Sequence, residues 1–131
     1  MNTPVKFETS KLLKEKGFDY HLLYNDFADY YDYFDKSVQG RLHVSDFPED
    51  KFPDENKWTP VPYIYQVIIW LYKKHGIWII SSYELNIENH KKEWFWIAIK
   101  DGEEIAYQYR DFNLPTEAYE AAIEFTLKNL I

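Results

Sequence analysis

Apolar and polar residues recur with a period that changes along this chain, and each change marks the border of an expected element. A helical period comes first, and its apolar stripe consists of Val5, Thr9, Leu12 and Leu13. We expect Thr3 to cap this helix and Pro4 to occupy its first position. Gly17 should end the helix in a left-handed conformation, with Phe18 folding back on the last turn.

The helical period returns twice in the second half of the chain. Thr59 is expected to cap the first of these helices and Gly76 to end it. Pro60 and Pro62 then fall in its first turn, where a missing backbone N–H costs little. The last helix is expected over residues 116–130, where alanines on one side would let it lie close to a sheet.

Three strands are expected between these two helices, over residues 77–84, 93–100 and 103–110, because β-branched and aromatic residues dominate there. Asp101-Gly102 suits a two-residue type I′ turn between the last two strands. The turn predicts the pairs Lys100–Glu103, Ala98–Ile105, Trp96–Tyr107 and Trp94–Tyr109. One face of this hairpin would carry Trp94, Trp96, Ala98, Ile105, Tyr107 and Tyr109. The other face would carry Phe95, Ile97, Ile99, Glu104, Ala106 and Gln108.

Residues 19–57 follow neither period well. Within them, residues 20–23 and 39–44 can form strands, and residues 45–57 are expected to be a polar loop. Together the elements predict an α+β fold, an antiparallel sheet of three to five strands with about three helices packed mainly on one face. The chain has neither a repeat nor a Gly/Ser linker, so we expect a single domain over residues 1–131.

Composition narrows the class of protein. Hydrophobic residues make up 46% of the chain and aromatic residues 20%, which predicts a packed core and excludes a disordered chain. The absence of cysteine excludes disulfides and thiolate chemistry, and the start of the chain lacks a signal-peptide pattern, so we expect a cytoplasmic protein that uses no membrane. The net charge of −7 disfavours nucleic acid as a partner and leaves basic proteins open.

Acidic residues recur at every third position in one aromatic-rich stretch. They are Asp26, Asp29, Asp32 and Asp35. If the stretch were helical, these carboxylates would drift slowly around one side of the helix, and such a surface could mimic the phosphates of DNA. A calcium site is disfavoured because the glycine and the terminal glutamate of a calcium loop are missing. The favoured reading is a solvated acidic face with aromatic rings packed behind it.

The aromatic face of the hairpin is the other candidate site. Only one face of the hairpin can pack on helices, so the other would expose rings, and exposed apolar patches mark binding surfaces. The candidate binding residues are Trp94, Trp96, Tyr107 and Tyr109, since Trp and Tyr are frequent anchors of interfaces. The alternative is that residues 19–57 cover this face.

Patterns of catalysis are missing from the sequence. The four histidines, His21, His43, His75 and His90, have no metal-ligand spacing, and the serines have no nucleophile context. No glycine-rich phosphate loop occurs, because each of the four glycines is expected in a turn or at a helix end. We therefore predict neither a cofactor nor a metal, and a non-enzymatic protein is favoured over an enzyme with an unrecognised site.

Three stretches resemble a known family. They read KLLKEKGFD at residues 11–19, WLYKKHGI at residues 70–77, and EAYEAAI at residues 117–123, running on to Leu127-Lys128. In this order and spacing they resemble small uncharacterised phage- and prophage-type proteins of gut anaerobic bacteria. The chain departs from that pattern at Thr59-Pro60, at Tyr72-Lys73 and throughout its acidic aromatic run. The resemblance implies a mobile-element accessory protein, and its shared residues are helix ends and core faces.

The leading hypothesis is thus a non-enzymatic accessory protein that binds a protein partner or itself through the aromatic sheet face. The alternative is an acidic, DNA-mimic-like inhibitor of a protein that handles nucleic acid or defends the host, acting through the four aspartates. If the gene belongs to a phage, the host cytoplasm is the expected location.

Overall fold

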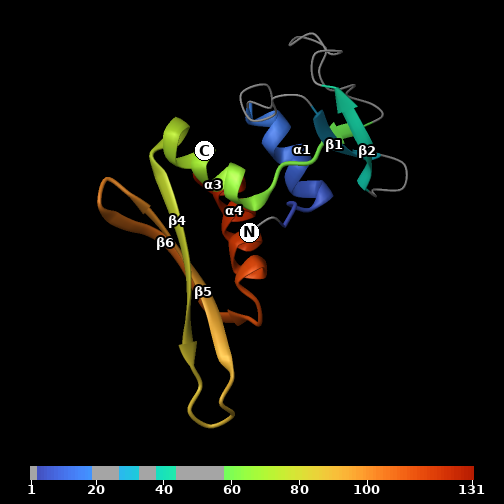
Figure 1. Ribbon diagram of the computed structural model, residues 1–131. Helices are drawn as coiled ribbons and strands as arrows, with labels where there is room; N and C mark the ends of the chain where they lie inside the picture. Colours follow the sequence, from blue (N-terminus) through green and yellow to red (C-terminus); the bar gives the residue numbers. More distant parts are fainter. Residues whose placement is uncertain (1–2, 19–26, 33–37, 44–57) are drawn as a thin grey trace. The chain divides into compact units, whose positions relative to one another are not determined.

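A computed structural model describes residues 3–18, 27–32, 38–43 and 58–131 of the chain (Figure 1). The chain divides into two compact units, one of Pro4–Tyr63 and one of Ile64–Ile131 together with Met1–Thr3. The expectation of a single domain over the whole chain stays a prediction.

The unit of Pro4–Tyr63 combines one described helix with a small sheet. The helix is α1 (Phe7–Glu15), and the strands are β1 (Phe27–Asp32), β2 (Val38–His43) and β3 (Trp58–Pro60). All pairings are antiparallel in the order β2-β1-β3. Strand β2 confirms the strand expected at residues 39–44 up to His43, whereas the expected strand at 20–23 and loop at 45–57 lie outside the described residues.

The start of α1 corrects the sequence prediction. Its N-cap is Lys6, in an extended conformation and without a side-chain cap, and Pro4 instead forms an antiparallel bridge with Tyr63. The expected end of the helix is confirmed, since Gly17 has a φ of 81° and the Phe18 N–H donates to the Leu13 carbonyl over 3.0 Å.

The second described helix also begins later than expected. Helix α3 runs over Ile64–His75, and Thr59 and Pro60 belong to strand β3. The two prolines explain the difference, because a residue that precedes proline is driven out of the helical region, and both Thr59 and Val61 precede one. The helix ends as predicted at Gly76, whose φ is 69°.

The unit that begins at Ile64 is a three-stranded meander covered by two helices on one side (Figure 1). After α3 come β4 (Ile77–Leu85), β5 (Lys92–Lys100), β6 (Glu103–Phe112) and α4 (Pro115–Asn129). The strands are antiparallel in the order β4-β5-β6, and both α3 and α4 contact the sheet. This confirms the predicted α+β class with an antiparallel sheet.

One face of this sheet forms the core with the helices. The sheet contributes four fully covered side chains, Ile77, Ile79, Trp96 and Ala98. Opposite them α3 buries Ile64, Val67, Ile68 and Leu71, and α4 buries Ala118, Ala122, Ile123 and Leu127. The small alanines of α4 permit the close approach to the sheet that the sequence predicts.

The register between β5 and β6 differs from the predicted one. Asp101 and Gly102 have φ values of 54° and 78°, as a type I′ turn requires, and Lys100 faces Glu103 as expected. One pair later the register shifts, so that Ala98 faces Ala106 and not Ile105. An extra residue in a strand sends every later side chain to the opposite face, which is why the predicted hairpin faces are wrong.

Beyond the shift, Trp96 faces Gln108 and Ile97 faces Tyr107, while Trp94 faces Phe112 after a second irregularity. The predicted pairs Trp96–Tyr107 and Trp94–Tyr109 are therefore not formed. A two-residue turn fixes the register only as far as the first bulge. The order of apolar and polar residues in β6 does not predict where a bulge occurs.

Candidate functional site

The face of the β4-β5-β6 sheet that α3 and α4 leave uncovered is largely apolar, and we call it the outer face. Its register assigns it seven apolar or aromatic side chains, Trp78, Ile80, Phe95, Ile97, Ile99, Tyr107 and Tyr109. Four of them are at least 37% exposed, with Tyr107 the most open at 58%, and the other three are half-buried. Polar faces are usual for antiparallel sheets that meet water, so this face needs an explanation.

The four predicted binding residues divide between the two faces. Trp96 is 1% exposed on the inner face, where its Nε1 donates to Gln108 Oε1 over 3.2 Å and its ring lies 5.4 Å from Phe125. Trp94 shares the inner side and contacts the Tyr83 ring at 5.0 Å. Tyr107 and Tyr109 belong to the outer face, so the predicted four-residue surface is not formed.

A cluster of three rings occupies the β5–β6 half of the outer face. The Tyr109 ring lies 5.0 Å from that of Phe95 and 4.8 Å from that of Tyr107. The Tyr109 hydroxyl lies 3.5 Å from Glu104 Oε1, at the limit of a hydrogen bond. Loss of hydration raises the pKa of Tyr109, and the Glu104 carboxylate raises it further, so this hydroxyl stays protonated. We call Phe95, Tyr107 and Tyr109 the ring cluster.

Negative charge lies at both ends of the outer face. Glu84 faces Glu93 directly across β4 and β5 at one end, and Glu104 faces Ile99 at the other. Like charges opposite each other destabilise a sheet, and Asn86 offsets this by donating its Nδ2–H to Glu93 Oε1 over 2.7 Å. None of the residues that the pairs within β4, β5 and β6 place on this face is Lys or Arg, and Lys91 lies just beyond the Glu84–Glu93 end.

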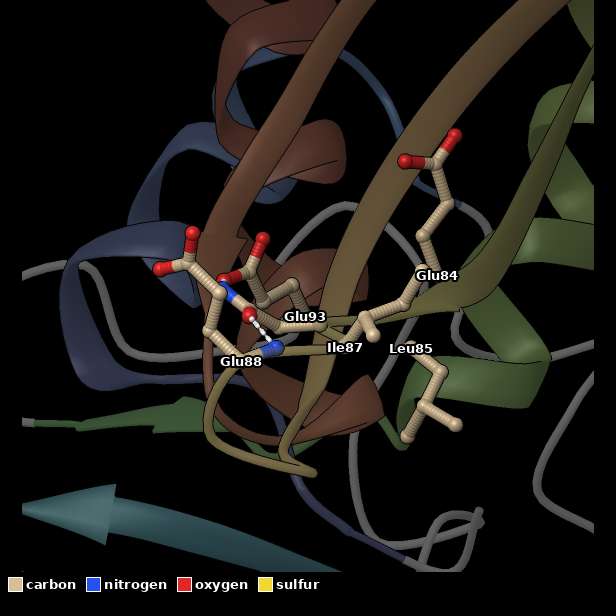
Figure 2. Close-up of a pocket in the computed structure, with 6 residues that line it drawn as sticks. Glu84, Leu85, Ile87, Glu88 and Glu93 are labelled. Atoms are coloured by element: carbon tan, nitrogen blue, oxygen red, sulfur yellow. Dashed lines mark hydrogen bonds between the residues drawn. The ribbon is translucent and has the colours of Figure 1, made fainter.

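A shallow hollow of about 370 Å³ lies at the β4–β5 turn (Figure 2). Its lining residues are Glu84, Leu85, Asn86, Ile87, Glu88 and Glu93. Asn86 Oδ1 accepts the Glu88 N–H over 2.9 Å, which makes the hollow a consequence of a side-chain-stabilised turn. Figure 2 shows the Glu84 carboxylate apart from those of Glu88 and Glu93. The described residues contain no group of three or more possible metal ligands, here or elsewhere.

The acidic run is only partly described. Asp29 and Asp32 lie in β1, where their Cα partners are Arg41 and Trp58. The conditional helical arrangement therefore does not hold for these two residues, because the segment is a strand. Asp26 and Asp35 lie outside the described residues.

His75 is the histidine whose surroundings are most distinctive in the described part of the chain. Its ring meets Trp70 edge-on at 5.0 Å, and its Nε2 is buried without a described hydrogen-bond partner. Burial lowers its pKa below the usual 6.5, and Lys74 and Lys100 lower it further. A neutral imidazole at a helix end can act as a pH-sensitive packing group, but no described carboxylate or nucleophile is arranged with it for catalysis.

Comparison with known proteins finds no matching family model, no similar curated protein and no similar solved structure. The resemblance to phage-type proteins therefore stays a prediction. None of the described helices is both long enough and apolar enough to cross a membrane.

Sequence reasoning missed the contributions of Trp78, Ile80 and Phe95 to the outer face. The signal for β4 was present, because Trp78 and Ile80 alternate with Ile77 and Ile79, so that the strand is apolar on both sides. An antiparallel strand that is apolar on both sides exposes one of them unless something covers it.

Proposed function

We propose that this protein is a non-enzymatic accessory protein, of the mobile-element type that its sequence resembles, and that it binds a protein partner through the ring cluster. The observation that carries the proposal is the exposure of 58% for Tyr107 and 42% for Tyr109 within a set of touching rings. Tyrosine provides a large contact area with few rotatable bonds, which makes it an efficient anchor in interfaces.

The charge around the ring cluster defines the chemistry of the partner. Glu93 and Glu104 place a carboxylate at each end of the outer face, with an apolar middle between them. The complementary surface is an apolar segment that carries Lys or Arg at both ends, since opposite charges at the rim guide association. Two outer faces brought together would oppose acid to acid, which favours a different protein over a second copy at this face.

A direct test is affinity capture from a lysate of the native host at low and high salt, followed by binding measurements with the purified partner. We expect Tyr107→Ala combined with Tyr109→Ala to weaken binding by about tenfold or more, as the loss of central aromatic anchors does. Raising the salt should weaken binding further, because it screens the charged rim.

The matched control is Tyr65→Ala on α3, because Tyr65 is 39% exposed and thus comparable to Tyr109 at 42%. Its removal should leave the affinity unchanged. Equal losses for the control and the double variant would reject the ring cluster as the binding site. A variant with asparagine at positions 26, 29, 32 and 35 separates the acidic-inhibitor alternative, which predicts lost binding in that variant and not in the tyrosine variant.

A further inference from the structure

The two edges of the β4-β5-β6 sheet are protected very differently. Strand β6, at one edge, has two register irregularities, and such bulges hinder the addition of another strand. Strand β4, at the other edge, pairs with β5 without interruption from Ile77 to Leu85. The described part of the chain supplies no second strand beside β4. A long, regular edge strand of this kind is a template for further pairing.

A single hydrogen bond at the end of β4 shows which of its backbone N–H and C=O groups point away from β5. The Asn86 N–H donates to the Lys91 carbonyl over 2.8 Å, and these residues continue the β4–β5 register. Because hydrogen-bonded and non-hydrogen-bonded pairs alternate in antiparallel sheets, the even-numbered residues of β4 direct their backbone groups to β5. The backbone groups of Ile77, Ile79, Ser81, Tyr83 and Leu85 therefore point to the open edge.

The side chains of β4 do nothing to block this edge. The strand reads IWIISSYEL and lacks the Pro, Lys or Arg that natural edge strands commonly use to prevent pairing. At its centre, Ser81 Oγ is buried and has no hydrogen-bond partner among the described residues. Buried hydroxyls are normally hydrogen-bonded. A partner from outside the described residues would therefore satisfy this oxygen.

We propose that a second copy of this chain pairs with β4 along its own β4, antiparallel, about a two-fold axis at Ser81. The two Ser81 residues then form a hydrogen-bonded pair, and each orphaned Oγ faces the other across it. Ile79 faces Tyr83 of the second copy, and Ile77 faces Leu85.

The same register also avoids repulsion between like charges. Glu84 is the one charged residue in β4, and it falls opposite Trp78 of the second copy and not opposite another acid. The result is a continuous six-stranded sheet whose two outer faces lie on the same side. Partner binding through the ring cluster and pairing through β4 therefore use different residues, and either can fail without the other.

The test measures the molar mass of the full-length chain by light scattering after gel filtration, at about 1–100 μM, a range that brackets micromolar dissociation constants. We expect a dimer at the upper concentrations. Ile80→Lys combined with Ser82→Lys places lysines opposite each other twice across the two-fold axis, so this variant should be monomeric throughout. Ile80→Glu combined with Ser82→Glu should be monomeric for the same reason.

The decisive measurement mixes the double-lysine variant with the double-glutamate variant, because each lysine then faces a glutamate across the two-fold axis. The mixture should recover the dimer, which also shows that both variants are folded. A wild-type chain that stays monomeric up to about 100 μM overturns the proposal. So does a dimer that survives both double substitutions.

The register has its own test, because the chain contains no cysteine. In the proposed dimer, Ser81→Cys brings two Cα atoms to about 5.5 Å, within the range of a disulfide. Ser82→Cys leaves them on a diagonal of about 7–8 Å, too far apart for a bond. Mild oxidation should cross-link the first variant and spare the second, and equal cross-linking of both would refute the two-fold axis at Ser81.

Discussion

Two tryptophans on opposite faces of one sheet provide a matched test of which face is the core. Trp96 is 1% exposed beneath α4, whereas Trp78 is 41% exposed on the outer face. We consider Trp96→Ala and Trp78→Ala, which remove the same side chain from neighbouring strands. If the faces are assigned correctly, the free energy of unfolding should fall much more for the first substitution.

The expected magnitudes follow from the buried area. A covered tryptophan removes about 150–250 Å² from water, which at about 25 cal/mol per Å² gives about 4–6 kcal/mol as an upper estimate. Measured losses for such truncations are about 3–5 kcal/mol, and we expect Trp96→Ala to fall near about 4 kcal/mol. Trp78 keeps about three-fifths of its surface covered and leaves no closed cavity, so we expect about 2 kcal/mol.

Urea unfolding followed by far-ultraviolet circular dichroism measures both losses without relying on tryptophan fluorescence. The difference of about 2 kcal/mol corresponds to a separation of roughly 1 M in the midpoints if the slope is near about 2 kcal/mol per M. Equal losses for the two variants, or a larger loss for Trp78→Ala, would refute the assignment of the inner and outer faces.

Two further predictions concern α3 and its end. The pKa of His75 is lowered in the folded chain, so the unfolded chain binds the proton first, and stability should fall as the pH drops below about 6.5 until the folded chain is protonated as well. Thermal unfolding of wild type and His75→Gln across this range should show a shallower pH dependence in the variant, and identical slopes would contradict the lowered pKa. Gly76→Ala should cost about 1 kcal/mol in urea unfolding, because Gly76 has a φ of 69° while the space beside it is open, and Gly76→Asn should cost less. A neutral Gly76→Ala would show that the helix end relaxes.

Much of the local structure could be predicted from the sequence. The ends of two helices were readable because Gly17 and Gly76 adopt conformations that other residues tolerate poorly. The three strands of the meander and the turn at Asp101-Gly102 were readable for similar reasons, since β-branched runs and type I′ turns depend on neighbouring residues. The starts of α1 and α3 were misplaced, because prolines that suit a first turn suit an extended segment equally well.

The candidate site, by contrast, depended on tertiary structure. The sequence by itself determined that Trp and Tyr would crowd this hairpin, and that only one side of it could be buried. It did not determine which rings share a side, since the shift opposite Ala98 moves Tyr107 and Tyr109 away from Trp96. The period of a strand is two residues, so a single extra residue reverses the faces, and the packing of α4 on Trp96 and Ala98 decides which face stays open.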